Sequence, residues 1–105
     1  MACIEFKQVL LEAIGETFSS LGESPKQSIE YHLENTFDLK VSQYPEDVAG
    51  FDRALKDIFG PGAILLETLI LNKLTEKAMQ IEGDSEKQEF YAAIRRLNDL
   101  WQKNI

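Results

Sequence analysis

The stretch FGPGA, residues 59–63, lies between two apolar runs and decides how the surrounding chain folds. A Gly-Pro-Gly sequence has two interpretations here: a phosphate-binding loop, or a corner at which one helix ends and another begins. A phosphate loop of the Walker type requires a preceding strand and the pattern G-x-x-x-x-G-K-[ST]. The residues before Phe59 have helical periodicity, and no Lys-Ser or Lys-Thr follows Gly62, so we predict the corner. Gly60 suits a helix C-terminus, and Pro61 suits the start of the next helix.

Apolar residues spaced three and four apart predict one helix on each side of this corner, over 45–59 and about 61–82. The same periodicity predicts helices over 3–21, about 24–37 with Ser24 as its N-cap, and about 84–104. The fourth of these helices is apolar around much of its circumference, which places it at the centre of a fold or at an interface. The sequence therefore predicts an all-α fold, a compact five-helix bundle with a central apolar fourth helix, as a single domain over 1–105.

Cysteine content and hydropathy predict the compartment. The only cysteine is Cys3, so no intrachain disulfide can form, which suits a reducing cytoplasm. We find no basic region followed by an apolar stretch at the N-terminus and expect no signal peptide. The longest uninterrupted apolar run, residues 63–66, is far too short to span a membrane. We therefore expect a cytoplasmic protein with no membrane partner.

The net charge of −7 is concentrated in the first half of the chain. Residues 1–52 carry ten acidic and three basic residues, whereas residues 53–105 carry eight of each. A phosphate backbone is repelled by such a field, so we expect no nucleic acid partner, and a DNA-bound regulator is disfavoured.

The chain has few of the imidazole and thiol side chains that serve as nucleophiles or metal ligands. The chain has one histidine and one cysteine, which nearly excludes imidazole-rich metal sites and a Cys-His catalytic pair. No loop has the spaced acids of a calcium site. We therefore predict no catalytic residues, no cofactor and no metal.

Two charged residues interrupt the apolar faces of their helices. Glu67 has apolar residues three and four positions away on both sides, and Lys26 lies on the same side of its helix as Ile29 and Leu33. Each side chain can extend to water, or the two can pair, or one can face a ligand. His32 borders the inner face of its helix, where a structural histidine is the alternative to a functional one. Lys26, His32 and Glu67 thus form a candidate polar cluster.

Apolar residues at regular spacing also predict an interface. Phe90, Ile94, Leu97 and Trp101 are spaced four, three and four residues apart, like a short coiled-coil seam. Leu65 and Leu69 belong to the apolar surface of the fourth helix, which exceeds what a small bundle covers. These six residues are the candidate interface, and they predict a two-fold homodimer.

Two blocks of the chain resemble a known family. LGESPKQSIEYHLENTF (21–37) and IFGPGAILLETLILNKL (58–74) are similar to the Nitrosopumilus output domain family, fifth type, a group of small archaeal helical domains of unknown function. The similarity covers about 10–75, and the helix over about 84–104 is an addition to it. The resemblance implies the effector end of a signalling system, and the family has no established catalytic activity or ligand. Since the chain stands alone, it leaves an adaptor or regulatory role open.

The combined expectation is a non-enzymatic protein-interaction domain, a signalling output or adaptor module whose partner is another protein. The alternative is a small-molecule sensor or enzyme with a polar pocket near Lys26, His32 and Glu67. A sensor requires those three side chains to converge on a cavity, whereas an interaction domain requires an exposed apolar or acidic surface.

Overall fold

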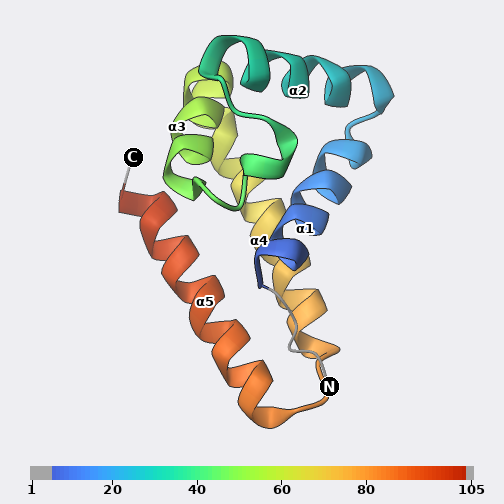
Figure 1. Cartoon of the computed structure of the whole chain (residues 1–105), viewed down its shortest axis with the longest axis vertical. Helices are drawn as coiled ribbons and strands as arrows, with labels where there is room; N and C mark the ends of the chain where they lie inside the picture. Colours follow the sequence, from blue (N-terminus) through green and yellow to red (C-terminus); the bar gives the residue numbers. More distant parts are fainter. Residues whose placement is uncertain (1–5, 104–105) are drawn as a thin grey trace.

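The computed structural model describes residues 6–103 and is built from helices (Figure 1). Its elements are α1 (Phe6–Ser20), α2 (Glu23–Phe37), α3 (Val48–Phe59), α4 (Ala63–Met79) and α5 (Asp84–Lys103), with short 3-10 turns η1 (Val41–Gln43) and η2 (Gly60–Gly62). The described residues contain no strand, which confirms the all-α class. Cys3 and the first residues of the predicted 3–21 helix lie outside the described range.

The FGPGA stretch forms the predicted corner between helices. Helix α3 ends at Phe59, and Gly60 has a φ of 58°, which glycine adopts without strain. Pro61 lies inside η2, and α4 begins at Ala63, two residues later than predicted. Because a helix rather than a strand precedes the glycines, the phosphate-loop interpretation is excluded.

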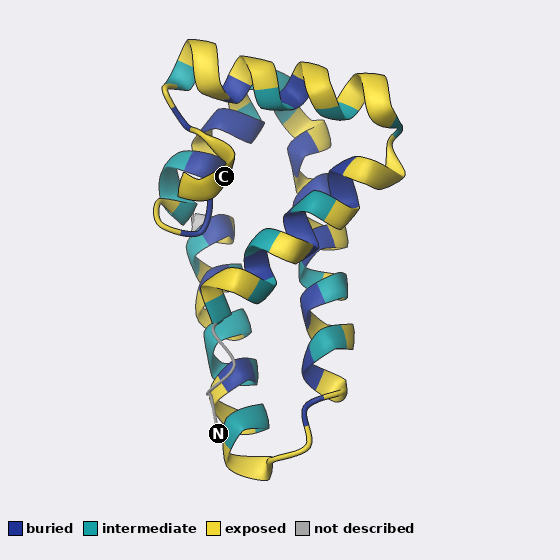
Figure 2. Cartoon of the chain, turned by 45° about the vertical axis from the view of Figure 1, so that its right-hand side comes forward, coloured by how far each residue is buried: buried dark blue, intermediate teal, exposed yellow. Residues whose placement is uncertain are grey.

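Helix α4 packs against α1, α3 and α5. Its buried side chains occupy the side that faces these helices: Ala63, Leu66, Glu67, Ile70, Leu74 and Ala78. Helix α2 lies across the end of the molecule opposite the α4–α5 loop, contacts α1 and α3, and is exposed along most of its length (Figures 1 and 2). The arrangement therefore separates α2 from the middle of α4, which determines where the site residues lie.

Two further helix starts, those of α2 and α3, differ from the sequence prediction. Helix α2 begins at Glu23 after Gly22, which has a φ of 111°, so Ser24 is not its N-cap. Helix α3 begins at Val48 instead of residue 45, because the Asp47 side chain accepts a hydrogen bond from the Gly50 amide at 3.0 Å and acts as the N-cap.

Aromatic rings join the elements at the centre of the fold. Tyr44, from the segment before α3, packs on Phe51 with ring centroids 4.8 Å apart, and Phe18 of α1 and Trp101 of α5 lie next to Phe51. All four rings are buried. The Tyr44 hydroxyl has no hydrogen-bond partner among the described residues, and burial raises its pKa.

Candidate functional site

Three ionisable side chains meet where α3, α4 and α5 pack together. Asp52 of α3 is fully buried, and Glu67 of α4 is only 5% exposed. Lys56, one turn after Asp52, places its Nζ 3.0 Å from Asp52 Oδ1 and 3.2 Å from Oδ2. We call Asp52, Lys56 and Glu67 the buried charge cluster.

Glu67 and Asp52 are two carboxyl groups sharing one site. Burial, above all, raises the pKa of Glu67 to about 8 from its ordinary value of 4.5; its hydrogen bond with Asp52 and the negative charge of Asp52 raise it further, against the opposing effect of Lys56. At neutral pH the Glu67 carboxyl therefore keeps its proton beside Asp52. The other Glu67 oxygen, Oε2, has no hydrogen-bond partner within the described part of the chain.

Lys56 also binds the end of α5. Its Nζ donates to the Trp101 carbonyl oxygen at 2.7 Å, and the Trp101 indole Nε1 donates to the Val48 carbonyl oxygen at 3.0 Å. The last carbonyls of a helix lack intrahelical partners and carry the negative end of its dipole, so a lysine is a favourable cap there. One lysine thus neutralises a buried aspartate and fixes α5 to α3.

The space beside the cluster is too small for a substrate. A cavity of about 60 Å³ adjoins Glu67 and Trp101, which leaves room for a few water molecules. Paired carboxyl groups with different pKa values can serve as general acid and base, but only where a substrate reaches them. The geometry instead supports a structural role: a proton held between α3 and α4.

The structure does not bring the predicted polar cluster together. His32 is exposed and Lys26 is half-buried, both on α2, while Glu67 faces α3 and α5. Among the described residues no ion pair or side-chain hydrogen bond joins Lys26 to Glu67, whose neighbours are Asp52 and Lys56. The predicted pairing is therefore corrected, and the physical reason is that α2 packs on α1 and α3 rather than along α4.

Sequence reasoning missed Asp52 and Lys56, although a signal was present. Asp52 has Val48 and Ala49 before it and Leu55 after it at helical spacing, so it too interrupts an apolar face. Lys56 lies four residues after Asp52, the spacing at which an ion pair forms along a helix. A charged residue among apolar helical neighbours, the signal that identified Glu67, was therefore also present in the third helix and indicated Asp52 and Lys56.

The candidate interface divides into two parts. Phe90, Leu97 and Trp101 are buried in the core of their own chain, and Ile94 is half-buried, so the α5 seam packs inside the monomer. This part of the interface prediction is corrected, because α4 and α3 already cover the seam. Leu65 and Leu69, one turn apart on α4, are exposed, Leu65 to 65%.

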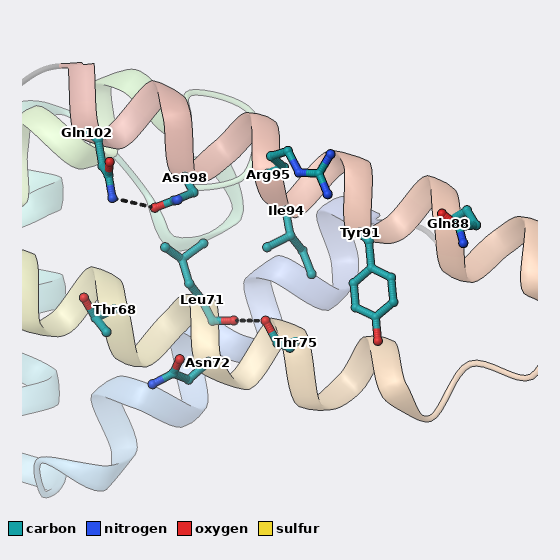
Figure 3. A pocket seen from close by; sticks show the side chains of 10 residues that line it. All are labelled: Thr68, Leu71, Asn72, Thr75, Gln88, Tyr91, Ile94, Arg95, Asn98 and Gln102. Carbon is teal, nitrogen blue, oxygen red and sulfur yellow. Dashed lines mark hydrogen bonds between the residues drawn. The ribbon is translucent and has the colours of Figure 1, made fainter.

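Two hollows of about 500 and 550 Å³ lie elsewhere on the surface. An apolar one of about 500 Å³, which includes His32, lies between the start of α2 and the end of α3. The other, which we call the α4/α5 groove, has a volume of about 550 Å³ (Figure 3). Its lining residues come from two helices: Thr68, Leu71, Asn72, Thr75, Gln88, Tyr91, Ile94, Arg95, Asn98 and Gln102.

Residues 6–103 contain neither a metal-binding cluster nor a membrane-spanning helix. In this range no group of three or more His, Cys, Asp or Glu side chains is placed to hold a metal ion. No helix in the same range combines the length and apolar character needed to cross a membrane.

Comparison with known proteins assigns no relative. No protein-family model matches the chain, and no curated protein and no solved structure is significantly similar to it. The resemblance to the Nitrosopumilus output domains therefore stays a prediction.

Proposed function

We propose that the chain is a non-enzymatic protein-interaction domain, of the signalling output or adaptor kind implied by the resemblance, and that it acts in the cytoplasm. The observation that carries this proposal is the outer face of α4, where the apolar side chains of Ile64, Leu65 and Leu69 are exposed. Clustered exposed apolar side chains on a soluble domain mark contact surfaces. In this proposal the compact arrangement of five helices around α4 is a rigid support for that face.

The partner we propose is another protein with an apolar groove bordered by basic residues. A helix face with two leucines one turn apart presents anchors suited to insertion into a groove. The chain's net charge of −7 favours a partner of opposite sign, because complementary fields speed association and reject wrong partners.

The alternative, a sensor or enzyme near Lys26, His32 and Glu67, has less support. Glu67 adjoins a cavity of about 60 Å³, whereas His32 lines a separate hollow on another part of the surface. Within residues 6–103 no hollow is lined by all three side chains, so this alternative lacks a common ligand site.

Site-specific photocrosslinking in the native cell tests the proposal. A photoreactive phenylalanine analogue replaces Leu65 in one variant and Tyr31 in a matched control, since these side chains are 65% and 68% exposed. We expect a discrete adduct with another protein from position 65 and none from position 31. The same adducts from both positions, or no adduct from position 65, would contradict an α4 interaction face.

The experiment also tests the homodimer. An adduct of twice the chain mass of 12.0 kDa from position 65 would identify a second copy as the occupant of this face and overturn the choice of another protein. Adding Leu69→Ser should abolish either adduct, because it removes the neighbouring anchor.

A further inference from the structure

The α4/α5 groove differs in charge from the rest of the molecule. The chain contains eighteen acidic residues, yet none lines the groove, whose only charged side chain is Arg95. Within residues 6–103, Arg95 makes no ion pair and no side-chain hydrogen bond that would neutralise it. An unpaired guanidinium in an acid-free hollow favours an anion.

The polar groups around Arg95 include amide donors that are not used within the chain. Thr68 and Thr75 use their hydroxyl protons on the carbonyls of Ile64 and Leu71, so they offer the groove little beyond acceptor lone pairs and methyl groups. The Gln102 side-chain amide donates to the Asn98 side-chain oxygen Oδ1 at 3.2 Å, which leaves the Asn98 side-chain N–H groups free to face a ligand (Figure 3). The groove therefore offers unused N–H groups to a ligand and presents no carboxylate.

The middle of the groove is apolar. Leu71 of α4 and Ile94 of α5 point toward each other between the helices, and the Tyr91 ring extends from α5 toward α4 beside them (Figure 3). A ligand that fits therefore combines a negatively charged head with an apolar body. The volume of about 550 Å³ lies within the range of small-molecule sites.

We propose that the α4/α5 groove binds a small organic anion, with Arg95 holding an oxyanion head, carboxylate or phosphate, and Leu71, Ile94 and Tyr91 holding an apolar body. The planar guanidinium fork matches either oxyanion. Leu65 and Leu69 do not line this groove, so the proposal does not depend on the protein-interaction proposal.

Binding is measured by two-dimensional NMR of the isotope-labelled full chain titrated with benzoate, phenyl phosphate and benzamide. We expect benzoate or phenyl phosphate to shift the side-chain amide signals of Asn72 and Asn98, and the tighter of the two identifies the head group. Benzamide has the same body without the charge, and it should bind about tenfold more weakly. Equal binding of benzamide and benzoate, or no shift with either anion at about 10 mM, a concentration well above ordinary ligand affinities, would overturn the proposal.

Two neighbouring arginines provide a matched control. Arg95 and Arg96 are both exposed on α5, but Arg96 lies outside the groove. Arg95→Gln should weaken binding about tenfold or more, and Arg96→Gln should leave it unchanged. If Arg95→Gln does not fold, Arg95→Lys, which retains the charge without the fork, is expected to weaken binding to a lesser degree. Equal binding by the Arg95 and Arg96 variants would overturn the assignment.

Discussion

At the scale of single residues, the most consequential feature is a proton. Glu67 and Asp52 are buried together, and Lys56 supplies only one positive charge for the two carboxyl groups. Ionising both would leave one negative charge uncompensated in the interior, so Glu67 remains protonated. The native state thus holds a proton that an unfolded chain releases.

This difference predicts a pH dependence of stability. The pKa of Glu67 is raised from 4.5 to about 8, so between these values the folded chain binds more protons than the unfolded chain. Its contribution is therefore complete below about pH 4.5 and is lost as the pH rises toward about 8, with a slope of up to ~1.4 kcal/mol per pH unit. Glu67→Gln keeps the hydrogen bond to Asp52 without a titrating proton, so it should remove this slope.

The measurement is urea unfolding followed by circular dichroism at about pH 5, 6.5 and 8, a range that spans the linkage window. The exposed Glu76, on the same helix, provides the control variant Glu76→Gln, which should retain the wild-type slope. Parallel pH profiles for the wild type and Glu67→Gln would contradict a proton held in the cluster.

At the scale of elements, helix existence was predictable and helix partners were not. The corner at Gly60 follows from local chemistry, since glycine at a helix end and a following proline have few other structures available. Glu67 could be recognised as an inward residue because its own helix surrounds it with apolar neighbours. Its partner could not, because helical periodicity gives the direction of a face but not which helix it meets.

Two glycines provide a matched test of the corner. A Cβ added to Gly60 or Gly15 would meet nothing within 4 Å, so neither substitution by alanine creates a clash. Gly60 has a φ of 58°, whereas Gly15 lies inside α1. Gly60→Ala should destabilise the fold by about 1 kcal/mol through backbone strain, and Gly15→Ala should stabilise it by about 0.5–1 kcal/mol through helix propensity.

Thermal unfolding of the two variants under identical conditions gives the comparison. Opposite shifts of the midpoint relative to wild type are expected. Shifts of the same sign would mean that the corner does not depend on the positive φ of Gly60.

At the scale of the whole molecule, the sequence shows how much apolar surface exists but not which part stays exposed. The sequence predicted both the seam on α5 and the leucines on α4 as interface residues. In the folded chain Trp101 of the seam is buried, whereas Leu65 of α4 is exposed. That outcome depends on how α5 folds back along α4 and α3, a long-range arrangement that local spacing does not encode. The charge asymmetry, in contrast, is fully readable from the sequence.

Charge predicts the behaviour toward nucleic acid. With ten acidic and three basic residues in its first half, the chain should repel a phosphate backbone. We expect no saturable binding to a random DNA duplex at submicromolar protein in about 0.15 M salt, where screening acts over about 8 Å. Fluorescence anisotropy of a labelled duplex measures this, and submicromolar affinity with a steep salt dependence would show that a local basic patch overrides the field.

The position of Trp101 has a practical consequence, because it is the only tryptophan in the chain. Its indole is hydrogen-bonded to the start of α3, and its backbone carbonyl accepts from Lys56, so all indole emission originates at the joint between α5 and α3. If the end of α5 detached while the helices stayed intact, the emission would shift to longer wavelength without a change in the far-ultraviolet signal. Trp101 is therefore an intrinsic fluorescent reporter of the contact between α5 and α3, and no label has to be attached.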